Sequence, residues 1–87
     1  MKKFNIKKLE KGDIFYDYNS HKNHILGFVD DGCDKIVVYK SWLKYKGYWG
    51  HYAKTLECIL YDISISQNFS KEEMARFFEL NDTYLSY

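Results

Sequence analysis

The stretch from Asp34 to Ile63 constrains the fold most, because it contains both tryptophans of the chain and is predicted to form three consecutive β-strands. The β-branched and aromatic run Lys35–Trp42 is typical of a strand. A Lys-Gly turn separates it from a second predicted strand, Tyr48–Ala53. A third strand is predicted over Leu56–Ile63, where apolar residues occupy both faces. We therefore expect this stretch to form the centre of a sheet.

Two more strands are predicted before this stretch. Asp13–Tyr18 alternates with a period of two, and His24–Asp30 follows it after the polar loop Asn19–Asn23. Gly27 lies inside the second of these strands, where a glycine usually marks a bulge or the sharp bend that a small barrel needs. An Asp-Asp-Gly sequence then indicates a turn into the next strand. The chain thus contains five predicted strands.

A helix is predicted over Lys71–Leu80. Ser70 is a good N-cap, and Glu73 completes a capping box with it. Phe69 and Met74 match the hydrophobic staple that often fixes the start of such a helix. Because about ten residues are too few for a stable isolated helix, we expect it to dock on the sheet. The predicted apolar stripe and C-terminal cap are Met74, Phe77, Phe78 and Asn81.

The chain has 87 residues, of which 46% are hydrophobic and 20% aromatic, so we expect one small ordered domain. The predicted class is mainly β (small α+β): a five-stranded antiparallel SH3-like barrel, or a curled open sheet, with one C-terminal helix. Its predicted parts are β structure over residues 1–63, a helix over 70–80 and a tail over 81–87. No apolar run reaches about 18 residues and the polar N-terminus is unlike a signal peptide, so we expect no membrane contact and a cytoplasmic location.

Several residues occur in the order of a known domain family. They are Gly12 with Tyr16 and Tyr18, the His24–Gly27 run, the Val37–Lys40 run, Trp49 and Leu56-Glu57. In this order they resemble a small bacterial and phage family of uncharacterised function, with the pattern G-x-Y-x-H-Y, V-L-G, L-V-V-Y and W-x-R-P-L-E-M-F. The resemblance covers about residues 12–60, and the chain departs from the pattern by having Lys54-Thr55 in place of R-P. It implies a small SH3-like barrel, no known activity and no catalytic residue.

The two cysteines are expected to be free thiols, because two are too few to staple a secreted scaffold. Cys58 is also expected in the core, on an apolar face of the last predicted strand. Zinc sites need closely paired cysteines or histidines, whereas the cysteines here are far apart and the His-x-x-His spacing is loose. We therefore expect no metal and no other cofactor. The candidate ligands weighed for a metal are His21, His24, Cys33 and Cys58.

A ligand-binding surface is predicted in Tyr39–Lys54, which contains four lysines, six aromatic residues and no acid. Lysines neutralise phosphates and aromatic rings stack on bases, a combination typical of single-stranded nucleic-acid platforms. The alternative is that the aromatic residues form core and the lysines are merely solvated. Trp42 and Trp49 are the two expected to be buried. The predicted ligand-binding residues are Lys40, Lys44, Tyr45, Lys46, Tyr48, His51, Tyr52 and Lys54.

Catalysis is not expected, because no motif brings Ser41 or Cys33 next to a histidine that would activate it. Charge is unevenly distributed: residues 1–54 carry 11 basic and 6 acidic residues, and residues 55–87 carry 2 basic and 6 acidic ones. This asymmetry favours one basic and one acidic face. We expect a non-enzymatic binding module for nucleic acid or a nucleotide. The alternative is a protein–protein interaction module, such as a phage-type inhibitor of a host factor, whose partner is a host protein or a second copy.

Overall fold

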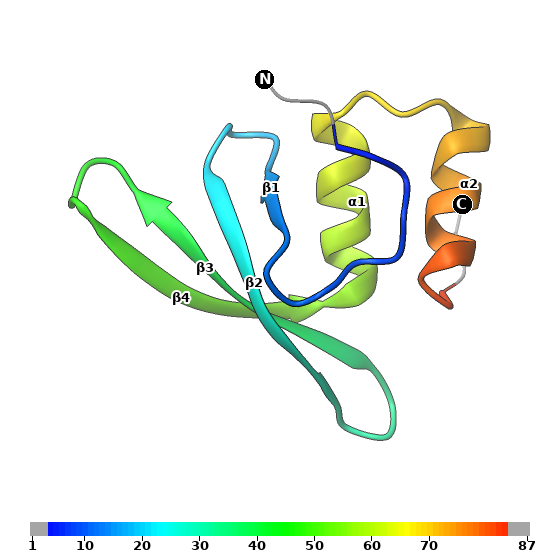
Figure 1. Ribbon diagram of the computed structural model, residues 1–87, viewed down its shortest axis with the longest axis horizontal. Coiled ribbons are helices and arrows are strands. Elements are labelled where there is room, and N and C mark those ends of the chain that lie inside the picture. The colour runs from blue at the N-terminus through cyan, green and yellow to red at the C-terminus, as the bar shows by residue number, and fades with distance from the viewer. Residues whose placement is uncertain (1–3, 84–87) are drawn as a thin grey trace.

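The computed structural model describes residues 4–83, which form a four-stranded antiparallel sheet and two helices (Figure 1). Residues 1–3 and 84–87, including the end of the predicted tail, lie outside this range. The strands pair in chain order, so the sheet is an open meander with β1 and β4 as its edges. The small, mainly β α+β class is confirmed, whereas the predicted count of five strands and one helix is wrong. The elements are β1 (Ile14–Tyr16), β2 (Lys22–Asp30), β3 (Lys35–Leu43), β4 (Tyr48–Thr55), α1 (Leu56–Ser66) and α2 (Lys71–Leu80).

The missing fifth strand is a helix. The segment Leu56–Ile63, predicted as a strand, forms most of α1, which starts directly where β4 ends. Thr55 caps the helix by accepting a hydrogen bond from the backbone amide of Cys58. Its apolar residues alternate as a strand would, but they also fit helical spacing, and the helix buries one complete stripe. Cys58 is exposed on the other side, so its predicted place in the core is wrong. The buried stripe is Leu56, Ile59, Leu60 and Ile63.

The bounds of α2 and its capping box agree with the sequence prediction. Phe77 and Phe78 are buried, whereas Met74 is only partly so. The expectation that α2 docks on the sheet is wrong, because it packs against α1 instead (Figure 1). The Phe78 ring meets the edge of Tyr61 of α1, with ring centroids 4.9 Å apart. The second helix therefore forms an outer layer behind the first.

Residues 4–13, here called the N-terminal strap, close the core over the two helices. Leu9 is buried, and Phe4 packs edge-on against Phe77 with ring centroids 6.0 Å apart. Asn81, which is only 3% exposed, ties the strap to the end of α2. Its side-chain oxygen accepts from the Leu9 amide at 2.8 Å, and its side-chain nitrogen donates to the carbonyls of Lys7 and Phe77. Asn81 thus holds together two segments from opposite ends of the chain.

Side chains on the sheet alternate between two faces. The face that packs on α1, here called the helix face, carries every buried strand residue: Phe15, Asn23, Ile25, Val37, Tyr39 and Ser41. A bulge between Ile25 and Gly27 interrupts the alternation in β2, as the glycine predicted. The other face, here called the open face, holds no buried residue in the four described strands. Its residues are Ile14, Tyr16, Lys22, His24, Val29, Ile36, Val38, Lys40, Trp42, Trp49, His51 and Ala53.

Replacing Asn81 with alanine should lower the free energy of unfolding by about 2 kcal/mol, because a buried group left without its partner costs about 1–3 kcal/mol and the Leu9 amide would lose its acceptor. Urea denaturation followed by tryptophan fluorescence measures the change. Asn19→Ala, at an exposed position in the β1–β2 turn, is the matched control and should change stability by less than about 0.5 kcal/mol. Equal midpoints for the two variants would contradict the role assigned to Asn81.

Candidate functional site

The hairpin formed by β3 and β4 projects away from the helices (Figure 1). Its turn, residues 44–47, is closed by the amides of Lys46 and Gly47, which both donate to the Leu43 carbonyl. Gly47 has a φ of 69°, a left-handed conformation that glycine adopts without strain. Tyr45 lies at the tip and is 99% exposed, with a lysine on each side of it in the chain. The hairpin therefore presents a free aromatic ring whose two neighbours in the chain are lysines.

The structure divides the predicted binding residues among three places. Lys44, Tyr45 and Lys46 form the turn. Lys40 and His51 lie opposite each other on the open face. The remaining three lie at strand positions of the helix face in β4: Tyr48, Tyr52 and Lys54. The eight residues therefore do not form one continuous surface, and the turn and the open face make up the larger connected part.

The two tryptophans form a cross-strand pair on the open face, next to the turn. Trp42 and Trp49 are directly opposite in the register, with ring centroids 5.3 Å apart in an edge-to-face arrangement. The Lys40 ammonium lies 4.5 Å from the centroid of the Trp49 ring. Both indoles are partly buried and neither belongs to the core cluster, so the expectation that they are core residues is wrong. The reason is the alternation of side chains along β3. Its core positions are the odd-numbered residues from Val37 to Ser41, so Trp42 and its partner Trp49 lie on the opposite face of the sheet.

His24, a candidate metal ligand that is not among the predicted ligand-binding residues, is a further open-face residue. The register places it directly opposite Lys40, which is in turn opposite His51. The three side chains therefore form a row across β2, β3 and β4. The four-residue turn of the hairpin sets the register between β3 and β4, so the sequence could have indicated that Lys40 and His51 are partners. The pairing of β2 depends on its bulge and had no comparable indication.

On the helix face, Tyr52 and Lys54 have structural contacts. The Tyr52 ring lies 5.8 Å from that of Tyr39 and crosses Gly50, where an added Cβ would come within 2.7 Å of the Tyr52 hydroxyl oxygen. Lys54 forms a 3.1 Å ion pair with Asp62 of α1. Burial lowers the pKa of Lys54, but the hydrogen bond to Asp62 and nearby charges outweigh it and hold that pKa above its ordinary value. These contacts join β4 to the body of the domain.

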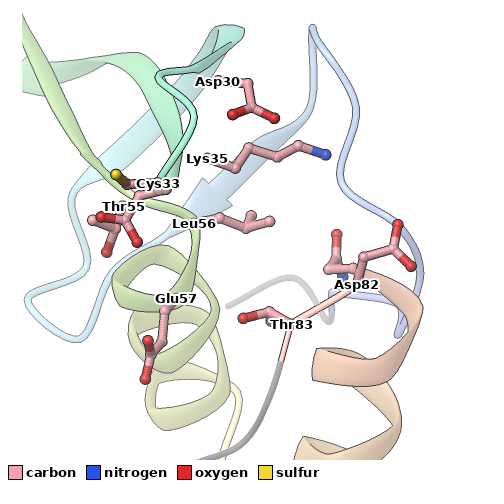
Figure 2. A pocket seen from close by; sticks show the side chains of 10 residues that line it. Asp30, Cys33, Lys35, Thr55, Leu56, Glu57, Asp82 and Thr83 are labelled. Atoms are coloured by element: carbon pink, nitrogen blue, oxygen red, sulfur yellow. The ribbon is translucent and has the colours of Figure 1, made fainter.

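Two hollows in the described part of the chain lie away from the predicted residues. One, of about 320 Å³, lies between the β2–β3 turn, the start of α1 and the end of α2. Figure 2 shows its lining, with Asp30 and Lys35 on one wall and Asp82 and Thr83 on the opposite one. Another, of about 350 Å³, lies between the N-terminal strap and β1. Neither contains a residue of the hairpin turn, so the candidate site is an exposed surface.

The four candidate metal ligands lie in different elements. His21 is in the β1–β2 turn, where its Nδ1 lies 3.6 Å from a carboxylate oxygen of Asp17. His24 is on the open face, while Cys33 in the β2–β3 turn and Cys58 in α1 are free and exposed thiols. Among residues 4–83, no three His, Cys, Asp or Glu side chains are grouped closely enough to hold a metal ion. The absence of a metal remains a prediction.

Comparisons with protein-family models, curated proteins and solved structures find no match to this chain. The resemblance to the SH3-like family therefore remains a prediction. Neither helix found between residues 4 and 83 is long and apolar enough to cross a membrane.

Raising the pH above about 10 should destabilise the fold, because burial raises the pKa of Tyr39 and the pKa of Lys54 is also raised. Both groups hold their protons more tightly in the folded chain than in the unfolded chain. Their contribution to the free energy of unfolding is therefore complete below the pKa of the unfolded chain, and it is lost as the pH rises through the pKa of the folded chain. The urea midpoint between pH 8 and about 11 measures this decline. Tyr39→Phe should make it shallower, and Tyr45→Phe, at the exposed tip, should not. Identical declines in both variants would contradict the contribution assigned to Tyr39.

Proposed function

We propose that this chain is a non-enzymatic module that binds single-stranded nucleic acid through the β3–β4 hairpin. The observation that carries the proposal is the fully exposed Tyr45 ring between Lys44 and Lys46, next to the tryptophan pair on which Lys40 lies. Aromatic rings that stack on bases, beside lysines that neutralise phosphates, support sequence-tolerant binding of single strands. We place the protein in the cytoplasm, because exposed free thiols such as those found here stay reduced there.

The charges along the sheet support the hairpin end as the place for a polyanion. At the opposite end of β3 lies the β2–β3 turn, in which Asp31 and Asp34 follow Asp30, the last residue of β2. Backbone amides of Asp34 and Cys33 donate to Asp31 and hold the pKa of its carboxyl below the usual value. Nine residues of strand separate the two turns by about 26 Å, which exceeds the Debye length of about 8 Å at physiological salt. The acidic end therefore does not cancel the attraction of the basic end.

The exposed rings limit the affinity. Tyr45 is fully exposed and Tyr48 is half-exposed, and each stacked base contributes about 1–3 kcal/mol. The Lys46 ammonium lies 5.9 Å from the centroid of the Tyr48 ring, so this ring carries a cation next to its stacking face. Two stacked bases and a few phosphate contacts favour micromolar rather than nanomolar binding.

A second candidate function is a protein-interaction module, such as an inhibitor of a host factor. The half of the open face nearer the β2–β3 turn favours it. Val29 is 52% exposed, and Ile36 and Val38 are only partly buried. Exposed aliphatic side chains on a sheet are typical of surfaces that bind proteins. This half lies toward the acidic turn, away from Tyr45. The two candidate functions therefore use different residues, and a partner protein would depend on Val29 rather than on Tyr45.

Binding of a fluorescent single-stranded oligonucleotide should weaken steeply with salt, because counterions are released from the phosphates. Replacing both Lys44 and Lys46 with alanine should reduce the slope of log affinity against log salt by about 1.4, or about 0.7 for each lost phosphate contact. Tyr45→Ala should weaken binding about tenfold and leave the slope unchanged, since stacking releases no counterions. Anisotropy titrations at several salt concentrations measure both quantities.

Lys71→Ala is the matched control, since it removes one positive charge at the start of α2, on the opposite side of the domain from the hairpin (Figure 1). It should leave both affinity and slope close to those of the parent. The nucleic-acid proposal fails if the parent shows no binding at low salt, or if Lys71→Ala affects binding as much as the loss of Lys44 and Lys46.

A further inference from the structure

A row of His24, Lys40 and His51 crosses the open face beside the tryptophan pair, and is here called the His-Lys-His row. Each member lies directly opposite the next one in the strand register. Neighbouring strands are about 4.8 Å apart, so the row spans about 10 Å across the sheet. His51 is exposed, and His24 and Lys40 are partly exposed. All three side chains can therefore meet a ligand that lies on this face.

The groups that surround this row carry no negative charge. From the flanking strand positions of the open face, β1 contributes an isoleucine and a tyrosine, β2 a lysine, and β3 and β4 their tryptophans. No Asp or Glu occupies an open-face position in the four described strands. A proton gained by either histidine would therefore add to the positive potential of Lys40, with no carboxylate on that face to offset it. The neighbouring open-face residues are Ile14, Tyr16, Lys22, Val38, Trp42, Trp49 and Ala53.

The row also lies on a continuous path from the hairpin tip. Lys40 is three residues from Leu43, the last residue of β3, which corresponds to about 10 Å along the strand. The tryptophan pair occupies the interval between the turn and the row. A single strand that stacks on Tyr45 would thus meet first an aromatic pair and then three cationic or titratable side chains. This order of rings followed by cations suits a nucleic-acid strand, whose bases and phosphates need both.

We infer that the His-Lys-His row binds the phosphate backbone of this strand, and that protonation of His24 and His51 strengthens the binding below neutral pH. The inference rests on the proposed function and extends its site from the hairpin onto the sheet. Histidine is the side chain that ordinarily changes its charge between about pH 5 and 8, and a protonated imidazole donates from both nitrogens. Protonation of both histidines would therefore add two phosphate contacts to the site.

Titration of a fluorescent oligo(dT) strand at several salt concentrations, at about pH 7.5 and about pH 5.5, tests this inference. Thymine does not change its protonation in this range, so any change comes from the protein. The salt slope of the parent should be steeper by about 1.4 at the lower pH, corresponding to two added contacts of about 0.7 each. The double variant His24→Gln, His51→Gln should lose this increase. His51→Gln alone, at an exposed position, should lose about half of it and serves if the double variant does not fold.

The third histidine provides the matched control, because His21 lies in the β1–β2 turn beside Asp17 and away from the open face. His21→Gln should keep the full pH dependence. The inference is overturned if the parent binds with the same slope at both pH values, or if His21→Gln removes the change as fully as the double variant does. In either case the proposed function still stands. If the parent does not bind oligo(dT) at either pH at low salt, the proposed function itself is overturned.

Discussion

The direct junction between β4 and α1 determines most of this structure. Thr55 is both the last residue of β4 and the N-cap of α1, so no loop separates the edge strand from the first helix. The helix packs back against β1, β3 and β4, and the Lys54–Asp62 ion pair joins α1 to β4 across this corner. Because α1 buries Leu60 and Ile63 completely, it covers one face of the sheet and leaves the other face open. The location of the candidate site follows from this arrangement.

The second layer extends the core that the sheet and the first helix form, because α2 adds Phe77 and Phe78 and the strap adds Leu9. Phe77 makes edge contacts with both Phe4 and Phe69, so one ring joins α2, the strap and the inter-helix loop. Three hydrogen bonds of Asn81 then fix the strap at the end of α2. Small domains bury a low fraction of their surface and are correspondingly marginal in stability. Contacts between the two ends of the chain are therefore a large part of what closes this core.

The parts of the fold that the sequence predicted are those set by local interactions. The capping box of Ser70 and Glu73 specifies the start of α2 within one helical turn, and the Asp-Gly and Lys-Gly turns delimit β3. The segment that became α1 satisfies both a two-residue and a helical period, and only packing on the sheet decides between them. The site was predicted in part for the same reason. Tyr45 and its lysines are adjacent in sequence, whereas the neighbours of Lys40 come from two other strands whose register is a tertiary property.

The tryptophan pair stabilises the hairpin, so its presence alone does not indicate ligand binding. Beyond Ser41, β3 pairs only with β4, and a two-stranded hairpin without further support is marginally stable in water. Cross-strand aromatic pairs contribute roughly 0.2–1 kcal/mol, and a cation over an exposed ring about 0.5–1 kcal/mol, so Trp42, Trp49 and Lys40 together stabilise the projecting part. Loss of either indole would therefore disturb the hairpin whatever its ligand. Tyr45 makes no such contribution, because its ring is fully exposed at the tip. Because the loss of Tyr45 would leave the hairpin intact, a variant at Tyr45 tests nucleic-acid binding more directly than a variant at either of the larger rings beside it.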